Sequence, residues 1–175
     1  MDADTAQTRL LDAAEELFNE HGIQAVGMDT IRSRSGVSLK RLYQLYPAKD
    51  RLVEAVLTRR DHTVLTDLRR YVDARTDPRE RVLAVFDFLE EWFACSDFRG
   101  CTFINTFGEL GGISGDVAEI ARTHKDAFRR YLRGLVPGGC PRPPRVRAGS
   151  AGTRPCACVR SRRRRRRFRR VRRTC

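Results

Sequence analysis

The chain has 175 residues, a formal net charge of +13 and 41% hydrophobic residues, enough for one medium-sized domain or a small domain fused to a larger one. No apolar run approaches the roughly 18 residues needed to cross a bilayer, and Asp2 and Asp4 stand where a signal peptide would be basic. These features exclude a membrane-spanning class, and we expect a cytoplasmic protein.

The positive charge is concentrated at one end of the chain. Residues 137–175 contain 15 arginines and no acidic residue, so removing them from the total of +13 leaves −2 for residues 1–136. This arginine-, proline- and glycine-rich tail has few large apolar residues, which predicts disorder. Its run of six arginines, Arg162–Arg167, would bind any polyanion. The tail is either a genuine nucleic-acid-binding arm or an out-of-frame translation of GC-rich codons.

Two short helices joined by a glycine turn are predicted near the N-terminus. The first covers residues 28–35 and ends at Gly36, which supplies a left-handed backbone at little steric cost. The second covers residues 39–46, with Ser38 as its N-cap and Pro47 as its stop. Such a pair has the shape of a helix-turn-helix that enters a DNA groove.

The second of these helices has two chemically different faces. Leu42, Leu45 and Tyr46 recur three and four residues apart and form its apolar stripe. The opposite face projects cations that seek phosphates and groups that reach base edges, namely Lys40, Arg41, Tyr43 and Gln44. An ordinary helical hairpin with a solvated basic face would show the same pattern, so periodicity alone leaves both interpretations open.

The spacing of the residues in this region resembles the N-terminal domain of the TetR (tetracycline repressor) family. The matching residues are Ile31, Gly36-Val37-Ser38, Leu42-Tyr43, Tyr46-Pro47, Lys49-Asp50 and Leu52. Upstream, an apolar stripe ended by Gly22 matches the family's first helix and comprises Leu10, Leu11, Ala14, Leu17 and Phe18. The resemblance covers about residues 9–135. The sequence departs from the usual pattern at Arg32, Leu45 and Tyr46.

The resemblance implies a DNA-binding head, residues 1–47, that regulates transcription, most often as a ligand-released repressor associated with the nucleoid. We expect Ser38, Tyr43 and Lys49 to hold phosphates and Lys40, Arg41 and Gln44 to face base edges, with three further residues, Arg32, Leu39 and Leu45, on the same surface. Members of the family pair as homodimers through two further helices. This sequence lacks them after residue 136, so pairing stays open.

Helical spacing continues through the body, residues 48–136, so the fold class is all-α. Helices are expected over residues 50–73, from Pro78 with Asp77 as N-cap, over residues 101–110, and from Ser114 or Gly115 to about residue 135. The buried face of the helix that begins at Pro78 is expected to contain Val82, Val85, Phe86, Leu89, Trp92 and Phe93.

Aromatic residues of the body line either a packed core or a small-molecule cavity. In the resembled family this is where inducers bind. The resemblance therefore implies a possible small-molecule effector as a partner, in a pocket lined by Phe86, Trp92, Phe93, Phe103, Phe107 and Phe128. The polar groups placed to orient the effector are Cys101, Asn105 and Glu109.

No catalytic site, metal site or cofactor is expected. The three histidines fall on separate predicted helices, and His62 and His124 are expected to be solvated. Cys156 and Cys158 lack the paired motif of a zinc site. The predicted function is sequence-specific binding of double-stranded DNA. Two alternatives are a non-specific nucleic-acid binder acting through the tail, and a helical small-molecule-binding protein with a non-functional head.

Overall fold

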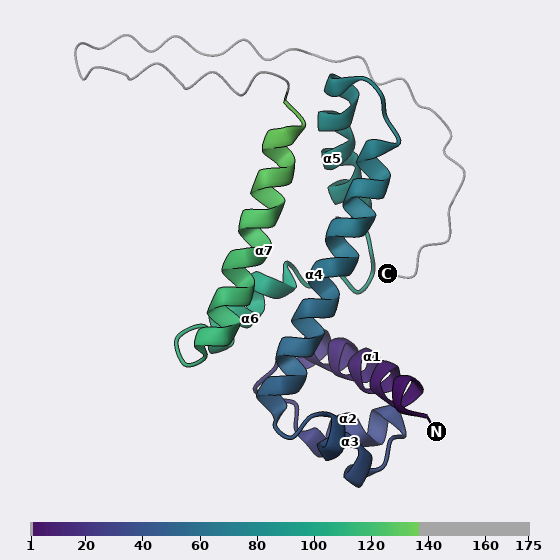
Figure 1. The fold of residues 1–175 in the computed structure, drawn as a ribbon, viewed down its shortest axis with the longest axis vertical. Coiled ribbons are helices and arrows are strands. Elements are labelled where there is room, and N and C mark those ends of the chain that lie inside the picture. The colour runs from purple at the N-terminus through teal and green to yellow at the C-terminus, as the bar shows by residue number, and fades with distance from the viewer. Residues whose placement is uncertain (1, 137–175) are drawn as a thin grey trace, which may run out of the picture. The chain divides into compact units, whose positions relative to one another are not determined.

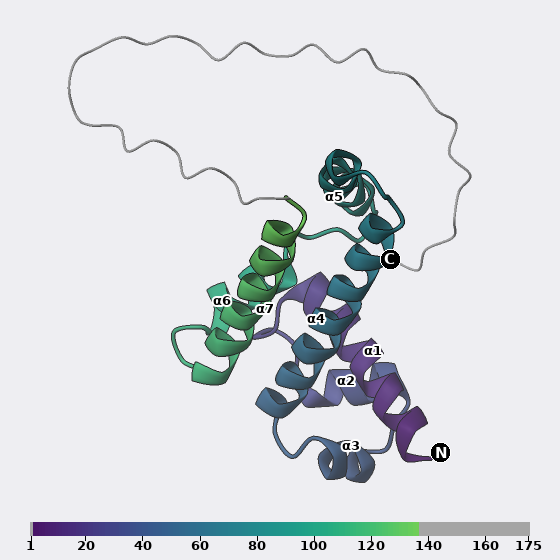
Figure 2. The same ribbon diagram turned by 45° about the horizontal axis from the view of Figure 1, so that its top comes forward.

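The computed structural model describes residues 2–136, and every regular element in that range is a helix (Figures 1 and 2). These residues lie in one compact unit of the chain. The seven helices of this range are α1 (Ala3–His21), α2 (Met28–Ser35), α3 (Leu39–Leu45), α4 (Lys49–Asp73), α5 (Pro78–Phe93), α6 (Thr102–Leu110) and α7 (Gly115–Gly134). The predicted all-α class is therefore confirmed. The tail, residues 137–175, lies outside the described residues.

The head is built from α1, α2 and α3, which begin and end at residues suited to those positions. Asp2 caps α1 by accepting a hydrogen bond from the Thr5 backbone N–H at 2.8 Å, and Gly22 follows the helix with a φ of 80°. Helix α1 begins at Ala3, seven residues before Leu10, the first residue of the predicted apolar stripe. Gly36 ends α2 in the left-handed region, with a φ of 66°.

Helix α4 belongs to two hydrophobic cores. Its first half contributes Leu52, Val53, Val56 and Leu57 to a core that also contains the inward faces of α1, α2 and α3. Its second half contributes Leu68 and Val72 to a separate core shared with α5 and the end of α7. The first core thus continues past residue 47, the predicted boundary between the head and the body.

The body helices α5 and α7 also begin at the predicted caps. The Asp77 carboxylate accepts from the Glu80 N–H at 2.9 Å, and Pro78 occupies the first turn of α5. Ser114 caps α7 by accepting from the Val117 N–H at 3.3 Å. Helix α7 contacts both α4 and α6, and its first half joins the core of the head through Val117 and Ala121.

The predicted buried face of α5 is wrong at two positions. Phe86 and Phe93 are 64% and 54% exposed, whereas Ala84, Val85 and Phe88 are buried. The reason is that the core shared with α4 and α7 covers only one side of the helix. The periodicity of α5 contains two apolar stripes, and the sequence does not say which one is covered.

Within residues 2–136, no helix has the length and apolar content that crossing a bilayer requires.

Candidate nucleic-acid interface

The turn between α2 and α3 is fixed by two serines. Ser35 is buried, and its hydroxyl donates to the Arg32 carbonyl at 3.1 Å and accepts from the Val37 N–H at 3.3 Å. Ser38 then accepts from the Arg41 N–H at 3.3 Å, which starts α3 as the sequence predicts. With Gly36 in the left-handed region between them, these bonds set the direction in which α3 leaves α2.

Helix α3 buries one face and exposes the other. Leu42 is fully buried and Tyr46, directly after the helix, is 5% exposed, so both anchor α3 to the core of the head. On the opposite side Leu39 and Tyr43 are 46% and 45% exposed, and Lys40 and Gln44 are exposed as well. A duplex approaching α3 would therefore meet side chains that the fold does not use.

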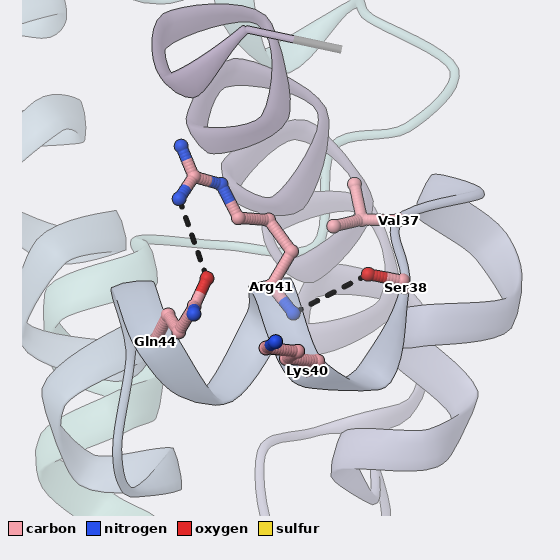
Figure 3. A pocket seen from close by; sticks show the side chains of 5 residues that line it. All are labelled: Val37, Ser38, Lys40, Arg41 and Gln44. Atoms are coloured by element: carbon pink, nitrogen blue, oxygen red, sulfur yellow. Dashed lines mark hydrogen bonds between the residues drawn. The ribbon is translucent and has the colours of Figure 1, made fainter.

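The outer face of α3 contains a hollow lined by Val37, Ser38, Lys40, Arg41 and Gln44 (Figure 3). Within it, the half-buried Arg41 guanidinium donates to the Gln44 side-chain carbonyl at 3.4 Å. This long hydrogen bond is weak and leaves both groups available to a duplex, where guanidinium donates to guanine and a carboxamide both donates and accepts at adenine.

The charge of this surface comes mainly from α3 itself. The helix carries Lys40 and Arg41 and no acidic residue. The arginines of α2 are instead paired, Arg32 with Asp29 at 3.2 Å and Arg34 with Glu16 at 2.9 Å. Such exposed pairs are weak and can exchange partners for phosphate.

Leu45 and Lys49, two residues predicted to contact DNA, lie at the margin of this surface. Leu45 is half-buried and packs against the core of the head. Lys49 is half-buried at the start of α4, and its ammonium donates to the Gln24 carbonyl at 3.5 Å. A contact of that length leaves the ammonium available for a stronger partner.

The aromatic residues of the predicted effector pocket fall into different surroundings. Phe103 belongs to the core of the head, and Phe128 packs against the core that α4 shares with α5. Trp92 and Phe93 contact Phe98, with ring centroids 5.5 and 4.9 Å apart. The others, Phe86 and Phe107, are exposed. The structure thus does not bring the six aromatic residues together around one site.

The polar groups assigned to that pocket have partners within the protein. The Glu109 carboxylate accepts from the Gln24 backbone N–H at 3.0 Å, and the Gln24 side-chain amide donates to the Glu109 carbonyl at 2.9 Å. Asn105 donates to the Arg99 carbonyl at 2.9 Å. The Lys125 ammonium lies 3.2 Å from the Cys101 sulfur. Glu109 therefore connects α6 to the loop that follows α1, a role that the sequence does not predict.

His124 is buried, which corrects the expectation that it is solvated. Its Nδ1 lies 2.6 Å from an Asp61 carboxylate oxygen, and its ring stacks on Phe103 with centroids 3.7 Å apart. Burial lowers the pKa of His124 below its ordinary value, and this outweighs the opposite effect of Asp61. The spacing Val117, Ala121, His124 follows the buried stripe of α7, so periodicity contained the necessary signal.

Comparison with known proteins identifies relatives of the N-terminal part of the chain. Residues 10–56 match the family model described as bacterial regulatory proteins, tetR family. The transcriptional activator FasR of Mycolicibacterium smegmatis is 41% identical over 91 residues, which cover 50% of this chain and 42% of FasR. An HTH-type transcriptional regulator of Mycobacterium tuberculosis is 29% identical over 127 residues, which cover 73% of this chain and 63% of that protein.

Solved structures extend the similarity to the body. A TetR-family transcriptional regulator from Streptomyces coelicolor superimposes with a TM-score of 0.71 and 27% identity, covering 75% of this chain and 65% of that one. A TetR-family regulator from Agrobacterium tumefaciens, at 16% identity and a TM-score of 0.69, shares the fold. The chain spans 42% of FasR, 63% of the Mycobacterium tuberculosis regulator and 65% of the Streptomyces coelicolor regulator, which is less than two thirds of each. It spans 70% of the Agrobacterium tumefaciens regulator.

Proposed function

We propose that this chain is a regulator of the TetR family and that it regulates transcription in the cytoplasm by binding double-stranded DNA through α3, which the family-model match over residues 10–56 and the shared fold support. The observation that carries the proposal is the exposed outer face of α3. Lys40, Tyr43 and Gln44 point away from a helix that Leu42 anchors in the core. A helix held in this way can enter the major groove without unfolding any part of the head.

The side chains of this face divide by chemistry into two proposed roles. Ser38, Tyr43 and Lys49 would hold phosphates, and these contacts would set the register of the protein on the duplex. Lys40, Arg41 and Gln44 would contact base edges, since lysine and arginine donate to guanine and glutamine pairs with adenine. Arg32 would add a phosphate contact by exchanging its exposed partner Asp29.

We further propose that the body regulates the head through α4 and Glu109. Helix α4 contributes residues to both cores, so a shift of its second half would also displace side chains in the core of the head. Arg59 on α4 donates to Asp12 and to Glu15 on α1, each at 2.6 Å, and therefore ties the helix to the head. An effector that binds the body in one arrangement of α4 better than in another would change DNA affinity by at most the ratio of those two effector affinities.

In vitro selection of bound duplexes tests the DNA-binding proposal. The full chain and a variant ending at Val136 are each used to enrich random duplexes at physiological salt. We expect both proteins to enrich the same short consensus, because α3 supplies the sequence preference. A promoter fused to that consensus then shows the direction of regulation, since repression is the family's usual outcome whereas FasR is named an activator.

Site variants separate this proposal from the two alternatives. Lys40→Ala combined with Gln44→Ala should abolish the consensus, whereas Arg130→Ala, which removes an exposed cation from α7, should preserve it. If the double variant binds as before and removal of residues 137–175 abolishes binding, the protein is a non-specific binder that acts through its tail. If no duplex is enriched but small molecules raise the unfolding temperature, the head does not function in DNA binding.

A further inference from the structure

Leu39, the first residue of α3, is a large apolar side chain that the fold leaves exposed. It is 46% exposed, and Tyr43, one turn further along the helix, is 45% exposed. The other leucines of α3 differ from it, because Leu42 is fully buried and Leu45 packs against the core of the head. The packing of the head therefore does not account for a leucine at position 39.

Leu39 lies beside the hydrogen-bonding groups of α3. Successive residues of a helix are rotated by about 100°, so Lys40 and Gln44 share the middle of the outer face. By the same rotation Leu39 and Tyr43 form an adjacent strip, on the side away from Arg41. Figure 3 shows Lys40, Arg41 and Gln44 around the hollow of this surface. The outer face thus fits a partner that offers hydrogen-bonding groups and an apolar group next to one another.

The major groove of a DNA duplex offers this combination. Base edges there carry donors and acceptors, and thymine adds an apolar group, its C5-methyl. Residues at the N-terminal end of a recognition helix are the ones that contact base edges, and Leu39 is the first residue of α3. A single exposed leucine is common on protein surfaces, so its position on this helix is what distinguishes Leu39. Phosphates are charged and do not match its side chain.

We propose that Leu39 is a specificity-determining residue, which contacts the C5-methyl group of a thymine and so favours a T·A base pair at that position of the bound sequence. This inference rests on the proposed function and adds to it a contact that needs no hydrogen bond. The contact removes apolar surface of both groups from water. It distinguishes thymine from cytosine and from uracil, and uracil differs from thymine in this methyl group alone.

Replacing thymine by deoxyuridine tests the contact on the full chain without changing the protein. Each duplex of a series carries the consensus obtained by in vitro selection, with one thymine replaced. The replacement removes the methyl group and keeps every hydrogen-bonding group of the base pair. Fluorescence anisotropy at one salt concentration gives the dissociation constants. We expect a rise of about three- to tenfold at one thymine, or at its symmetry-related pair in a palindromic consensus, because an apolar contact of one methyl group is lost.

Variants of residue 39 show whether Leu39 makes the contact. Leu39→Ala should bind the thymine duplex about three- to tenfold more weakly than the original chain does, and should bind the thymine and uracil duplexes equally, because both changes remove the same contact. Leu39→Met keeps an apolar side chain of similar volume and should keep the preference for thymine. Leu83→Ala, at a similarly exposed leucine of α5, is the matched control and should also keep it. Circular dichroism and thermal unfolding confirm that each variant folds.

The possible outcomes separate this inference from the proposed function. If no consensus is enriched, the proposed function fails and this inference fails with it. If a consensus is enriched but contains no thymine, or tolerates uracil at every thymine, the proposed function stands and the contact of Leu39 is overturned. A preference for thymine that Leu39→Ala leaves intact would overturn the contact as well.

Discussion

The head and the body differ in how many of their large apolar side chains they bury. In the head, the large apolar residues of α1 and α2 face inward, and only α3 presents large apolar groups, Leu39 and Tyr43, to solvent. In the body, α5 and α6 expose Leu83, Phe86, Phe93, Ile104 and Phe107 in addition to the residues they bury. The head thus buries the large apolar residues of α1 and α2 in its own core, whereas the body leaves large apolar side chains of α5 and α6 exposed within residues 2–136. We propose that the exposed groups of α3 face DNA.

Removing a core side chain of the head should give the largest effect. Leu42→Ala deletes a fully buried side chain that anchors α3, so we expect the free energy of unfolding to fall by about 3 kcal/mol. Phe86→Ala, which truncates an exposed side chain of α5, should change it by less than about 0.5 kcal/mol. Urea unfolding followed by circular dichroism measures both. Equal losses of unfolding free energy from the two variants would contradict the difference in burial between the head and the body.

Breaking the attachment of α4 to α1 should have an intermediate effect. Arg59→Met keeps much of the side-chain volume but removes the hydrogen bonds to Asp12 and Glu15. Because the arginine is partly exposed, we expect a loss of only about 1 to 2 kcal/mol in the free energy of unfolding. Arg51→Met, which removes exposed contacts to Glu54 on α4 and Asp116 on α7, is the control and should have little effect. A loss from Arg51→Met as large as that from Arg59→Met would contradict the assignment.

A buried hydroxyl in the head should lower the free energy of unfolding slightly. The Tyr46 hydroxyl is buried and has no hydrogen-bond partner within the described residues. Tyr46→Phe removes the unpaired group and keeps the ring, so the free energy of unfolding should rise by about 1 kcal/mol. Differential scanning calorimetry would show this as a higher unfolding temperature. A lower temperature would mean that the hydroxyl has a partner in solution.

The smallest expected effect is a pH dependence from His124, where the head and the body meet. Burial lowers the pKa of this histidine in the folded protein, so the folded state favours the neutral ring. Its contribution to stability is therefore complete above the unfolded pKa of about 6.5 and is lost as pH falls through that value towards the folded pKa. Unfolding temperatures from pH 8 to pH 5 should fall less steeply for His124→Asn than for the original chain. Identical slopes would contradict this account.

The sequence predicts the head well because its determinants are local. Gly36, Ser38 and Pro47 act within a few residues of where they stand, and the structure places the ends of α2 and α3 within one residue of the prediction. The same holds for Asp77 and Pro78 at the start of α5. These positions depend on capping and on backbone freedom, which a reader of the sequence can evaluate directly.

The sequence predicts the body less well because burial there depends on contacts between distant helices. Two apolar stripes on α5 are equally periodic, and only the positions of α4 and α7 decide that Phe88 is buried and Phe86 is not. The hydrogen bonds of Glu109 with Gln24 and the burial of His124 beside Asp61 could not be predicted for the same reason, since these partners lie 85 and 63 residues away. The proposed roles of the residues on α3 stay predictions, as does the effector site.

The central claim is that α3 discriminates among base pairs, and a ratio of two affinities tests it most directly. The dissociation constant of the full chain is measured for the selected duplex and for one with the consensus base pairs exchanged, at the same salt concentration. We expect a ratio of at least about 1,000 for the original chain, falling by about tenfold or more in Gln44→Ala and unchanged in Arg130→Ala. A ratio near one in the original chain, or a ratio that Gln44→Ala leaves intact, would contradict the claim.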